Sequence, residues 1–174
     1  MDDAAERRFR EFVETRSVAL MRLAYLLAGG DQHAAEDLLQ TALAKTAARW
    51  GSVDNPEPYV RRAMYRQQVS NWRRTRRRRE TQVGVLPDQA GRAGPDAASA
   101  VDLKLTVRTA LARLTPKQRA VLVLRFFEDL PEAEVARVLG CSVGTVRSTT
   151  HRSLARLREL APELNAQEPE EARR

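Results

Sequence analysis

The spacing of apolar side chains predicts three helices in the first half of the chain. The first apolar stripe, at the period of an amphipathic helix, consists of Phe9, Phe12, Val13, Leu20, Leu23 and Leu27. Gly29 and Gly30 predict its end, and Asp31 is suited to cap a second helix. The stripe of that second helix consists of Leu38, Leu39, Ala42, Leu43, Thr46 and Trp50. A third helix is expected from Tyr59 to Arg73.

The apolar period is lost after the third helix and returns near residue 103. Glycine and proline occur five times within residues 84–95, a composition typical of a flexible linker. A fourth helix is expected over residues 103–114. Thr115, Pro116 and Gln118 then form a capping box with proline at the first helical position, which predicts the start of a fifth helix.

The last predicted helices have the order of a helix-turn-helix. Pro131 begins a short helix that Gly140 closes, and Ser142 caps the long helix that follows. The inner face of this long helix is expected to consist of Val146, Thr150, Leu154 and Leu157. Two helices joined by a three-residue turn are typical of DNA-binding proteins.

These elements predict an all-α fold of two small helical domains joined by a flexible linker, the second domain being the helix-turn-helix. No segment has the alternation expected of a strand. The expected units are residues 1–80, a linker over 81–102, residues 103–162 and a tail over 163–174. Because each half has the size of a small compact unit, we expect two independent cores rather than one shared core.

Positive charge is concentrated in the third predicted helix. The whole chain has a formal net charge of +7, whereas residues 59–79 alone carry nine arginines and no acidic residue, which gives +9. Such a density of like charge is costly unless the partner is a polyanion. The stretch therefore predicts a nucleic-acid-binding surface, with a solvated charged face as the alternative.

The sequence also argues against several other classes of protein. No apolar run is long enough to span a bilayer, the acidic start lacks the plan of a secretory signal, and Cys141 is the single cysteine. His33 and His151 lack a matching set of metal ligands or a nucleophile at a recognisable spacing. We therefore expect a soluble cytoplasmic protein that is not an enzyme and that holds no cofactor or metal.

Two segments of the chain carry familiar motifs. The run from Leu130 to Gly140, followed by the segment from Ser142 to Ser148, resembles the promoter-reading helix-turn-helix of bacterial sigma factors. Asp37-Leu38-Leu39-Gln40 resembles the segment by which sigma factors bind RNA polymerase. With the arginine-rich helix and the linker in between, the resemblance covers about residues 9–162. It is to the small extracytoplasmic-function sigma factors, in an arginine-rich form typical of actinobacteria.

The resemblance implies a sigma factor that binds core RNA polymerase and promoter DNA and directs promoter-specific transcription initiation, on the nucleoid when bound to polymerase. Asp37 and Gln40 would contact the polymerase together, since residues three apart share a helix face. Thr41 belongs to the same surface but departs from the family, in which this position is often acidic. The resemblance also implies an anti-sigma factor as a partner, which a flexible linker would permit.

For the third helix, the resemblance implies recognition and melting of the minus-ten promoter element. Tyr65 and Trp72 would offer aromatic platforms to unstacked bases, with core packing as the alternative for Tyr65. The arginines implied as phosphate contacts are Arg73, Arg74, Arg76, Arg77, Arg78 and Arg79.

For the last helix, the resemblance implies recognition of the minus-thirty-five element. Polar side chains on the face opposite Val146 can reach base edges in the major groove. The residues implied to do so are Arg147, Ser148, His151 and Arg152. Thr145 and the amino terminus of the helix would hold a phosphate.

Two other functions remain open from the sequence alone. A conventional dimeric helix-turn-helix regulator without polymerase contact explains residues 116–158 but not the Asp37 segment, and it requires a palindromic pair of half-sites. An RNA-binding adaptor that uses the arginine run would keep its full sequence preference without the last helix. Stoichiometric binding of core polymerase separates a sigma factor from the regulator.

Overall fold

The computed structural model describes residues 2–81 and 100–162, with the side chains of residues 2–74 and 105–162. Within these ranges the chain is helical and has no strand, which confirms the all-α prediction. The first half comprises α1 (Asp3–Ala28), α2 (Gln32–Ala47), the 3-10 turn η1 (Trp50–Ser52) and α3 (Pro56–Thr81). The last of these helices is longer at both ends than the predicted 59–73.

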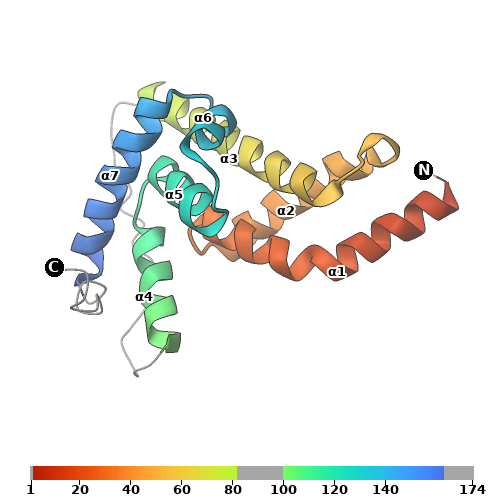
Figure 1. Ribbon diagram of the computed structural model, residues 1–174, viewed down its shortest axis with the longest axis horizontal. Helices are drawn as coiled ribbons and strands as arrows, with labels where there is room; N and C mark the ends of the chain where they lie inside the picture. The colour runs from red at the N-terminus through yellow and green to blue at the C-terminus, as the bar shows by residue number, and fades with distance from the viewer. Residues whose placement is uncertain (1, 82–99, 163–174) are drawn as a thin grey trace.

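The second half contains the predicted helix-turn-helix. Its elements are α4 (Ala100–Ala112), α5 (Pro116–Leu122), the π-helical turn η2 (Val123–Phe127), α6 (Glu132–Leu139) and α7 (Val143–Leu160). Figure 1 shows α6 beside the carboxy-terminal part of α3, with α7 on the outer side of the second half. Most of the predicted linker and the whole predicted tail, at 82–99 and 163–174, lie outside the described residues.

Capping residues begin the helices where the sequence predicts. Asp31 Oδ1 accepts a hydrogen bond from Ala34 N at 3.0 Å, and Ser142 Oγ accepts one from Thr145 N at 3.1 Å. The reciprocal capping box that begins α5 is formed by Thr115 and Gln118. Because these side chains satisfy backbone N–H groups that the helix itself leaves unpaired, the local sequence is sufficient to set the helix starts.

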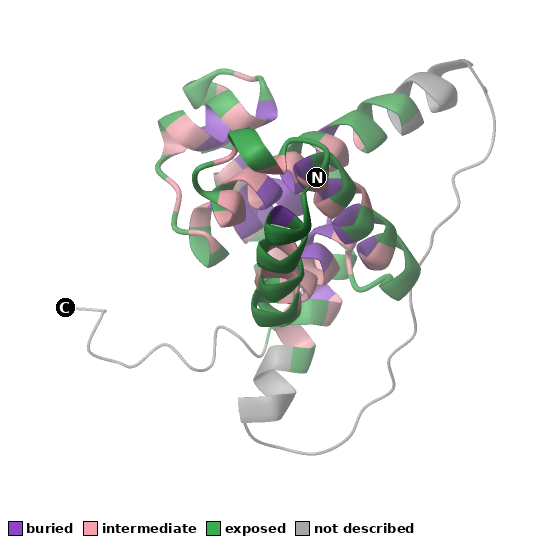
Figure 2. Cartoon of the chain, turned by 90° about the vertical axis from the view of Figure 1, so that its right-hand side faces the viewer, coloured by how far each residue is buried: buried purple, intermediate pink, exposed green. Residues whose placement is uncertain are grey.

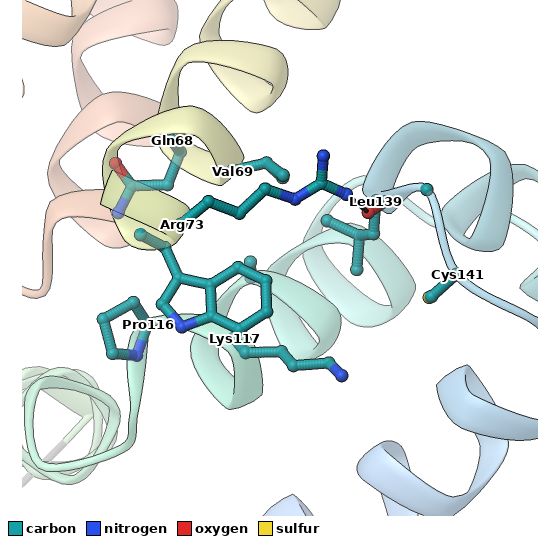
Figure 3. A pocket seen from close by; sticks show the side chains of 10 residues that line it. Gln68, Val69, Arg73, Pro116, Lys117, Leu139 and Cys141 are labelled. Atoms are coloured by element: carbon teal, nitrogen blue, oxygen red, sulfur yellow. Dashed lines mark hydrogen bonds between the residues drawn. The ribbon is translucent and has the colours of Figure 1, made fainter. Parts of the chain in front are cut away.

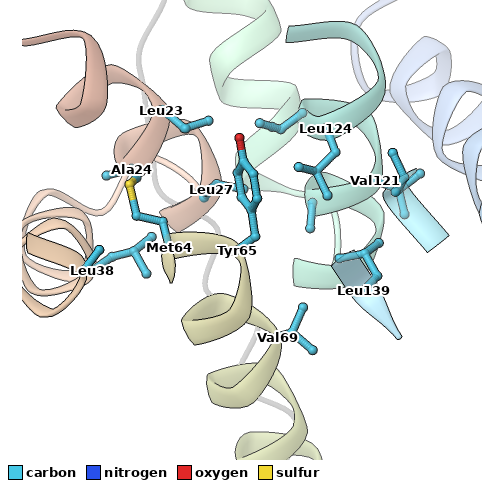
Figure 4. Packing of buried hydrophobic residues seen from close by; sticks show 14 of the residues in the cluster. Leu23, Ala24, Leu27, Leu38, Met64, Tyr65, Val69, Val121, Leu124 and Leu139 are labelled. Atoms are coloured by element: carbon cyan, nitrogen blue, oxygen red, sulfur yellow. The ribbon is translucent and has the colours of Figure 1, made fainter. Parts of the chain in front are cut away.

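The hydrophobic core is continuous across the two halves, so the expectation of two independent cores is wrong. One cluster of buried residues includes Leu27 of α1, Met64 and Tyr65 of α3, and Val121 and Leu139 of the second half (Figure 4). Figure 2 shows buried residues where the helices meet. We call the surface where α1 and α3 meet α5 and α6, including the contacts of Glu128 with α3, the seam. Each half alone is small, and closing the seam removes further apolar surface from water.

Two helix-ending glycines permit close approach at the seam. Gly29 ends α1 with φ of 74° and Gly140 ends α6 with φ of 64°, both in the left-handed region. A Cβ atom at Gly29 would lie 2.5 Å from Arg119 Nη1, and one at Gly140 would lie 3.0 Å from Arg73 Nη2. Each of these arginines belongs to the other half of the chain, so both glycines serve packing as well as helix termination.

The inner face of α7 differs from the predicted stripe. Val146 is fully buried as expected, but the other buried residues are Thr149 and Ser153. The remaining predicted positions are half-buried, namely Thr150, Leu154 and Leu157. Ser153 Oγ donates to Thr149 O at 2.6 Å. The small Ser153 hydroxyl is satisfied within its own helix, which allows close packing of α7 against α5 and α6.

Candidate polymerase and nucleic-acid interfaces

α2 presents a polar face beside its buried stripe. Asp37 and Gln40 are exposed and Thr41 is half-buried, whereas Leu38 and Leu39 are buried. The buried side of α2 packs against α1 and α3. The structure therefore brings Asp37 and Gln40 together on an accessible surface that is turned away from the core.

The outer face of α7 carries a set of exposed polar side chains. Its members are Arg147, Ser148, His151 and Arg152. Ser148 Oγ donates to Thr145 O at 3.2 Å, and Arg152 Nε donates to Ser148 O at 3.3 Å. Because Val146 is fully buried on the opposite side, all four side chains lie on the outer face of α7, away from the core, as predicted.

Thr145 lies in the first turn of α7 and is half-buried. Its backbone N–H donates to Ser142 Oγ at 3.1 Å, and its own hydroxyl lies 2.9 Å from the same oxygen. The cap therefore occupies the Thr145 amide. A phosphate at this helix end would instead meet the amides of Val143 and Gly144, which the helix leaves unpaired.

Arg147 is held by an acid from the preceding helix. Glu132 Oε2 accepts hydrogen bonds from Arg147 Nε at 3.1 Å and from Nη2 at 2.8 Å. The hydrogen bond from Arg147 lowers the pKa of Glu132, and the same bond raises the pKa of Arg147. Glu132 was not identified from the sequence, because it is fifteen residues away from Arg147 and no local pattern links the two.

Tyr65 does not face solvent. It is 5% exposed, and its hydroxyl donates to Glu128, which follows η2. Burial, and then the hydrogen bond to Glu128, raises the pKa of Tyr65 far above its usual value. Because the ring is enclosed by the seam, Tyr65 offers no free face to a base here. The prediction of a base platform is wrong for this arrangement, and the alternative of core packing is confirmed.

Trp72 is half-buried at the edge of the seam. Lys117 Nζ lies 5.6 Å from the centroid of its ring, a cation–π contact between the two halves. Trp72 also lines a cavity of about 140 Å³ between α3, α5 and the end of α6. Figure 3 shows other residues that line this cavity, among them Gln68, Val69, Arg73, Pro116, Lys117, Leu139 and Cys141.

The arginines near the end of α3 are exposed where the structure describes them. Arg73 Nη2 donates to Leu139 O at 3.4 Å, and Arg74 Nη2 donates to Asn71 Oδ1 at 3.0 Å. The backbone of α3 continues to Thr81, but the following predicted side chains lie outside the described residues, namely Arg76, Arg77, Arg78 and Arg79.

A second cavity, of about 320 Å³, extends the positive surface of α3 onto the helix-turn-helix. It lies between α3 and α6 and is lined by four arginines, Arg66, Arg73, Arg74 and Arg137. Arg137 comes from α6, and its Nη1 lies 3.6 Å from Glu134 Oε1. Both halves therefore contribute positive charge to this side of the molecule.

Glu128 is the acidic centre of the seam and was missed by sequence reasoning. Arg61 Nη1 and the Tyr65 hydroxyl both donate to this carboxylate, whose side chain is 6% exposed. Arg61 Nη2 also donates to Glu57 at 2.7 Å. Burial alone would lower the pKa of Arg61, but the hydrogen bonds to Glu128 and Glu57 outweigh burial and raise it.

Arg119 joins helix ends from both sides of the seam. It is 6% exposed, its Nε donates to Leu27 O at 3.0 Å, and its Nη1 donates to Leu114 O at 3.2 Å. Burial lowers the pKa of Arg119 to about 10, so the side chain stays charged at neutral pH. The carbonyl end of α1, where the helix dipole is negative, compensates for this buried charge.

Known proteins are similar to this chain over most of its length. Residues 104–157 match the family Sigma-70, region 4. The chain is 42% identical over 158 residues to the RNA polymerase sigma-E factor of Streptomyces coelicolor, in a match that covers 87% of this chain and 84% of that protein. It is 30% identical over 164 residues to the ECF RNA polymerase sigma factor SigL of Mycobacterium tuberculosis, in a match that covers 89% of this chain and 89% of that protein. The chain belongs to the extracytoplasmic-function sigma factors.

The likeness of this sigma factor to a solved structure spans both halves. It matches the sigma factor RpoE from Bartonella quintana, in complex with the anti-sigma factor NepR, with a TM-score of 0.65 and 25% identity. The match covers 93% of this chain and 99% of that chain. The Streptomyces relative supports the actinobacterial character predicted from the arginine-rich sequence.

The part of the chain that the structure describes lacks two other kinds of feature. In residues 2–81 and 100–162, no helix combines the length and the apolar character needed to cross a membrane. The same ranges contain no group of three or more histidine, cysteine, aspartate or glutamate residues able to hold a metal ion.

Proposed function

We propose that this sigma factor binds core RNA polymerase and directs promoter-specific transcription initiation, without catalysing a reaction itself. The observation that carries the proposal is the outer face of α7, where Arg147 and its polar neighbours stand opposite the buried Val146 in a helix-turn-helix. Arginine bidentate to guanine is the commonest specific contact in the major groove. The similarity to sigma factors along most of the chain supports the same function.

The described surfaces suggest a division of labour. Asp37, Gln40 and Thr41 on α2 contact the polymerase. The outer face of α7 reads the minus-thirty-five element, while the Thr145 side chain and the unpaired amides of Val143 and Gly144 at the start of α7 hold a phosphate. The arginines at the end of α3 bind phosphates near the minus-ten element, and such contacts position the protein without reading sequence. These are Arg73, Arg74, Arg76, Arg77, Arg78 and Arg79.

The aromatic residues of α3 reach melted DNA only after the seam has changed. Trp72 is half-buried against Lys117, and Tyr65 is enclosed by both halves. Base stacking requires a free ring face. In the proposed function, Trp72 is therefore the aromatic contact that needs the smaller rearrangement of the seam.

The proposed partners follow from the same likeness. The solved relative RpoE is in complex with an anti-sigma factor, and we propose an anti-sigma factor as a regulator of this chain too. A protein with this function works in the cytoplasm and is associated with the nucleoid when it is bound to polymerase.

Run-off transcription with purified core polymerase on a library of promoters tests the proposal. The full chain should bind the polymerase stoichiometrically and initiate only at promoters that share upstream and downstream elements. Palindromic DNA binding without polymerase binding would favour the dimeric regulator instead. Unchanged sequence preference after loss of the last helix would favour the RNA adaptor.

A further inference from the structure

We propose that Glu132 is a positioning residue that sets the base preference of Arg147. The inference rests on the proposed function, in which α7 reads the minus-thirty-five element. Arg147 has 72% of its side chain exposed, yet it is engaged by Glu132, whose side chain is 29% exposed. An exposed arginine in a reading position is thus already oriented before any DNA is bound.

The geometry of the pair fixes which edge of the guanidinium remains available. Glu132 Oε2 accepts from Arg147 Nε at 3.1 Å and from Nη2 at 2.8 Å. A guanidinium has five N–H donors in a rigid fork, so both donors of Nη1 and one donor of Nη2 stay free. One donor from each of these nitrogens forms the pair of parallel N–H groups that binds O6 and N7 of guanine.

The fold holds Glu132 in a fixed place relative to α7. Glu132 is the first residue of α6, where a negative charge is favoured by the helix dipole. Val135 of α6 and Val146 of α7 are both fully buried, so the two helices are packed as one unit. The carboxylate therefore acts from a rigid helix rather than from a loop.

Glu132 favours specificity at the expense of general DNA affinity. A free arginine side chain samples many rotamers, and each of them can meet a phosphate or a different base. The hydrogen bonds to Glu132 restrict Arg147 to fewer orientations, while the negative charge of Glu132 repels DNA phosphates. Neutralising Glu132 should therefore strengthen binding to all DNA and weaken the preference for guanine, whereas loss of folding would weaken both.

The experiment uses holoenzyme, assembled from core polymerase and the full chain, on promoters that vary each minus-thirty-five base in turn. R147A identifies the base pair that Arg147 reads and should lower guanine preference there by about 10-fold or more. E132A should lower the same preference by about 3-fold, and E132Q by less, because an amide oxygen still accepts one hydrogen bond. In the R147A background, E132A should change the preference no further.

E159Q is the matched control, since it removes the same charge from an exposed acid on α7 that pairs with Arg156 at 2.7 Å. It should change affinity slightly and leave the base preference intact. The inference is overturned if E132A keeps the full preference, if E159Q lowers it equally, or if E132A still lowers it in the R147A background. A lack of any minus-thirty-five preference in the unaltered holoenzyme would contradict the proposed function itself.

Discussion

The two surfaces proposed to bind DNA differ in how the chain presents them. The outer face of α7 is exposed and needs no rearrangement to meet a major groove. The aromatic face of α3 is turned into the seam, where Tyr65 is 5% exposed and Trp72 lies against Lys117. In this arrangement the polar face of α7 is free, while the aromatic residues of α3 are covered by the other half of the chain.

The difference arises from how each surface is determined. α7 presents its polar face through contacts with α4, α5 and α6, all of them within the second half. α3 is an amphipathic helix whose second apolar side is covered by α5 and α6. Accessibility of the aromatic face of α3 is therefore a property of the seam, and variants at the seam should change this accessibility without changing α7.

Arg119 should be the largest single contributor to the seam. R119A removes hydrogen bonds to Leu27 O and Leu114 O and leaves a buried space beside Gly29. We expect the free energy of unfolding to fall by about 3 kcal/mol, because buried carbonyl groups lose their donor. Urea unfolding followed by circular dichroism measures this loss.

R156A provides the matched control for R119A. Arg156 is exposed and forms a surface ion pair with Glu159 within α7, and its loss should change stability by about 0.5 kcal/mol or less. Equal losses in R119A and R156A would mean that Arg119 does not hold the two halves together.

Glu128 should be next in size, and its loss should uncover α3. E128A leaves the Tyr65 hydroxyl without its acceptor and removes one of the two carboxylates that bind Arg61. We expect a loss of about 2 kcal/mol in stability. Acrylamide quenching of Trp72 fluorescence should rise at the same time, because the edge of the seam opens.

The quenching measurement requires Trp72 to be the only tryptophan. The chain has two, and Trp50 packs on Phe9 with ring centroids 5.0 Å apart, among residues that belong to the first half alone. W50F therefore serves as the background for both E128A and the unaltered Glu128. Base preference that depends on Arg147 should stay unchanged in E128A, whereas unchanged quenching would show that Glu128 does not control access to α3.

Local features of the fold were predictable from the sequence. Asp31, Thr115 and Ser142 cap their helices through hydrogen bonds with residues three positions further along the chain. The residues that decide a helix start are therefore close together in the sequence. The order of helices and the helix-turn-helix follow from the same local rules. The π-helical turn η2 and the small buried residues of α7 were not predictable from local rules, because packing between helices determines both.

The interfaces were predictable only where a helix face is decided locally. Asp37, Gln40 and Arg147 are exposed as expected, since each lies opposite a buried stripe of its own helix. The hydrogen bond between Arg61 and Glu128 joins residues 67 positions apart in the sequence, and the one between Arg119 and Leu27 joins residues 92 positions apart. Pairs so far apart leave no periodic pattern in the sequence, so the shared core and the burial of Tyr65 could not be predicted from it.

Salt dependence should separate phosphate binding from base reading. Replacing Arg73 and Arg74 by glutamine should make the fall of log affinity with log salt less steep by about 1.8. Each phosphate that the protein neutralises contributes about 0.9 to the steepness of that fall. R147A should instead relax preference at one upstream base pair. Holoenzyme binding to promoter DNA at several salt concentrations gives both quantities. If both variants relax base preference equally, the proposed division between the two surfaces is wrong.

The Tyr65 hydroxyl should give the smallest effect and a pH signature of its own. Y65F keeps the ring in the core and leaves Arg61 bound to Glu128, so the loss near neutral pH should be about 1 kcal/mol. Because the pKa of Tyr65 is raised in the folded chain, its contribution is complete below the unfolded value of about 10 and declines as pH rises above it.

Urea unfolding of Y65F and of the unaltered chain from about pH 8 to about pH 11 isolates the contribution of the Tyr65 hydroxyl. Tyr25 and Tyr59 are present in both, so they cancel in the difference. The unaltered chain should lose stability more steeply above about pH 10 than Y65F, by up to about 1.4 kcal/mol for each pH unit. Identical slopes would mean that Tyr65 ionises as easily in the folded chain as in the unfolded one, and that its hydroxyl is not enclosed by the seam.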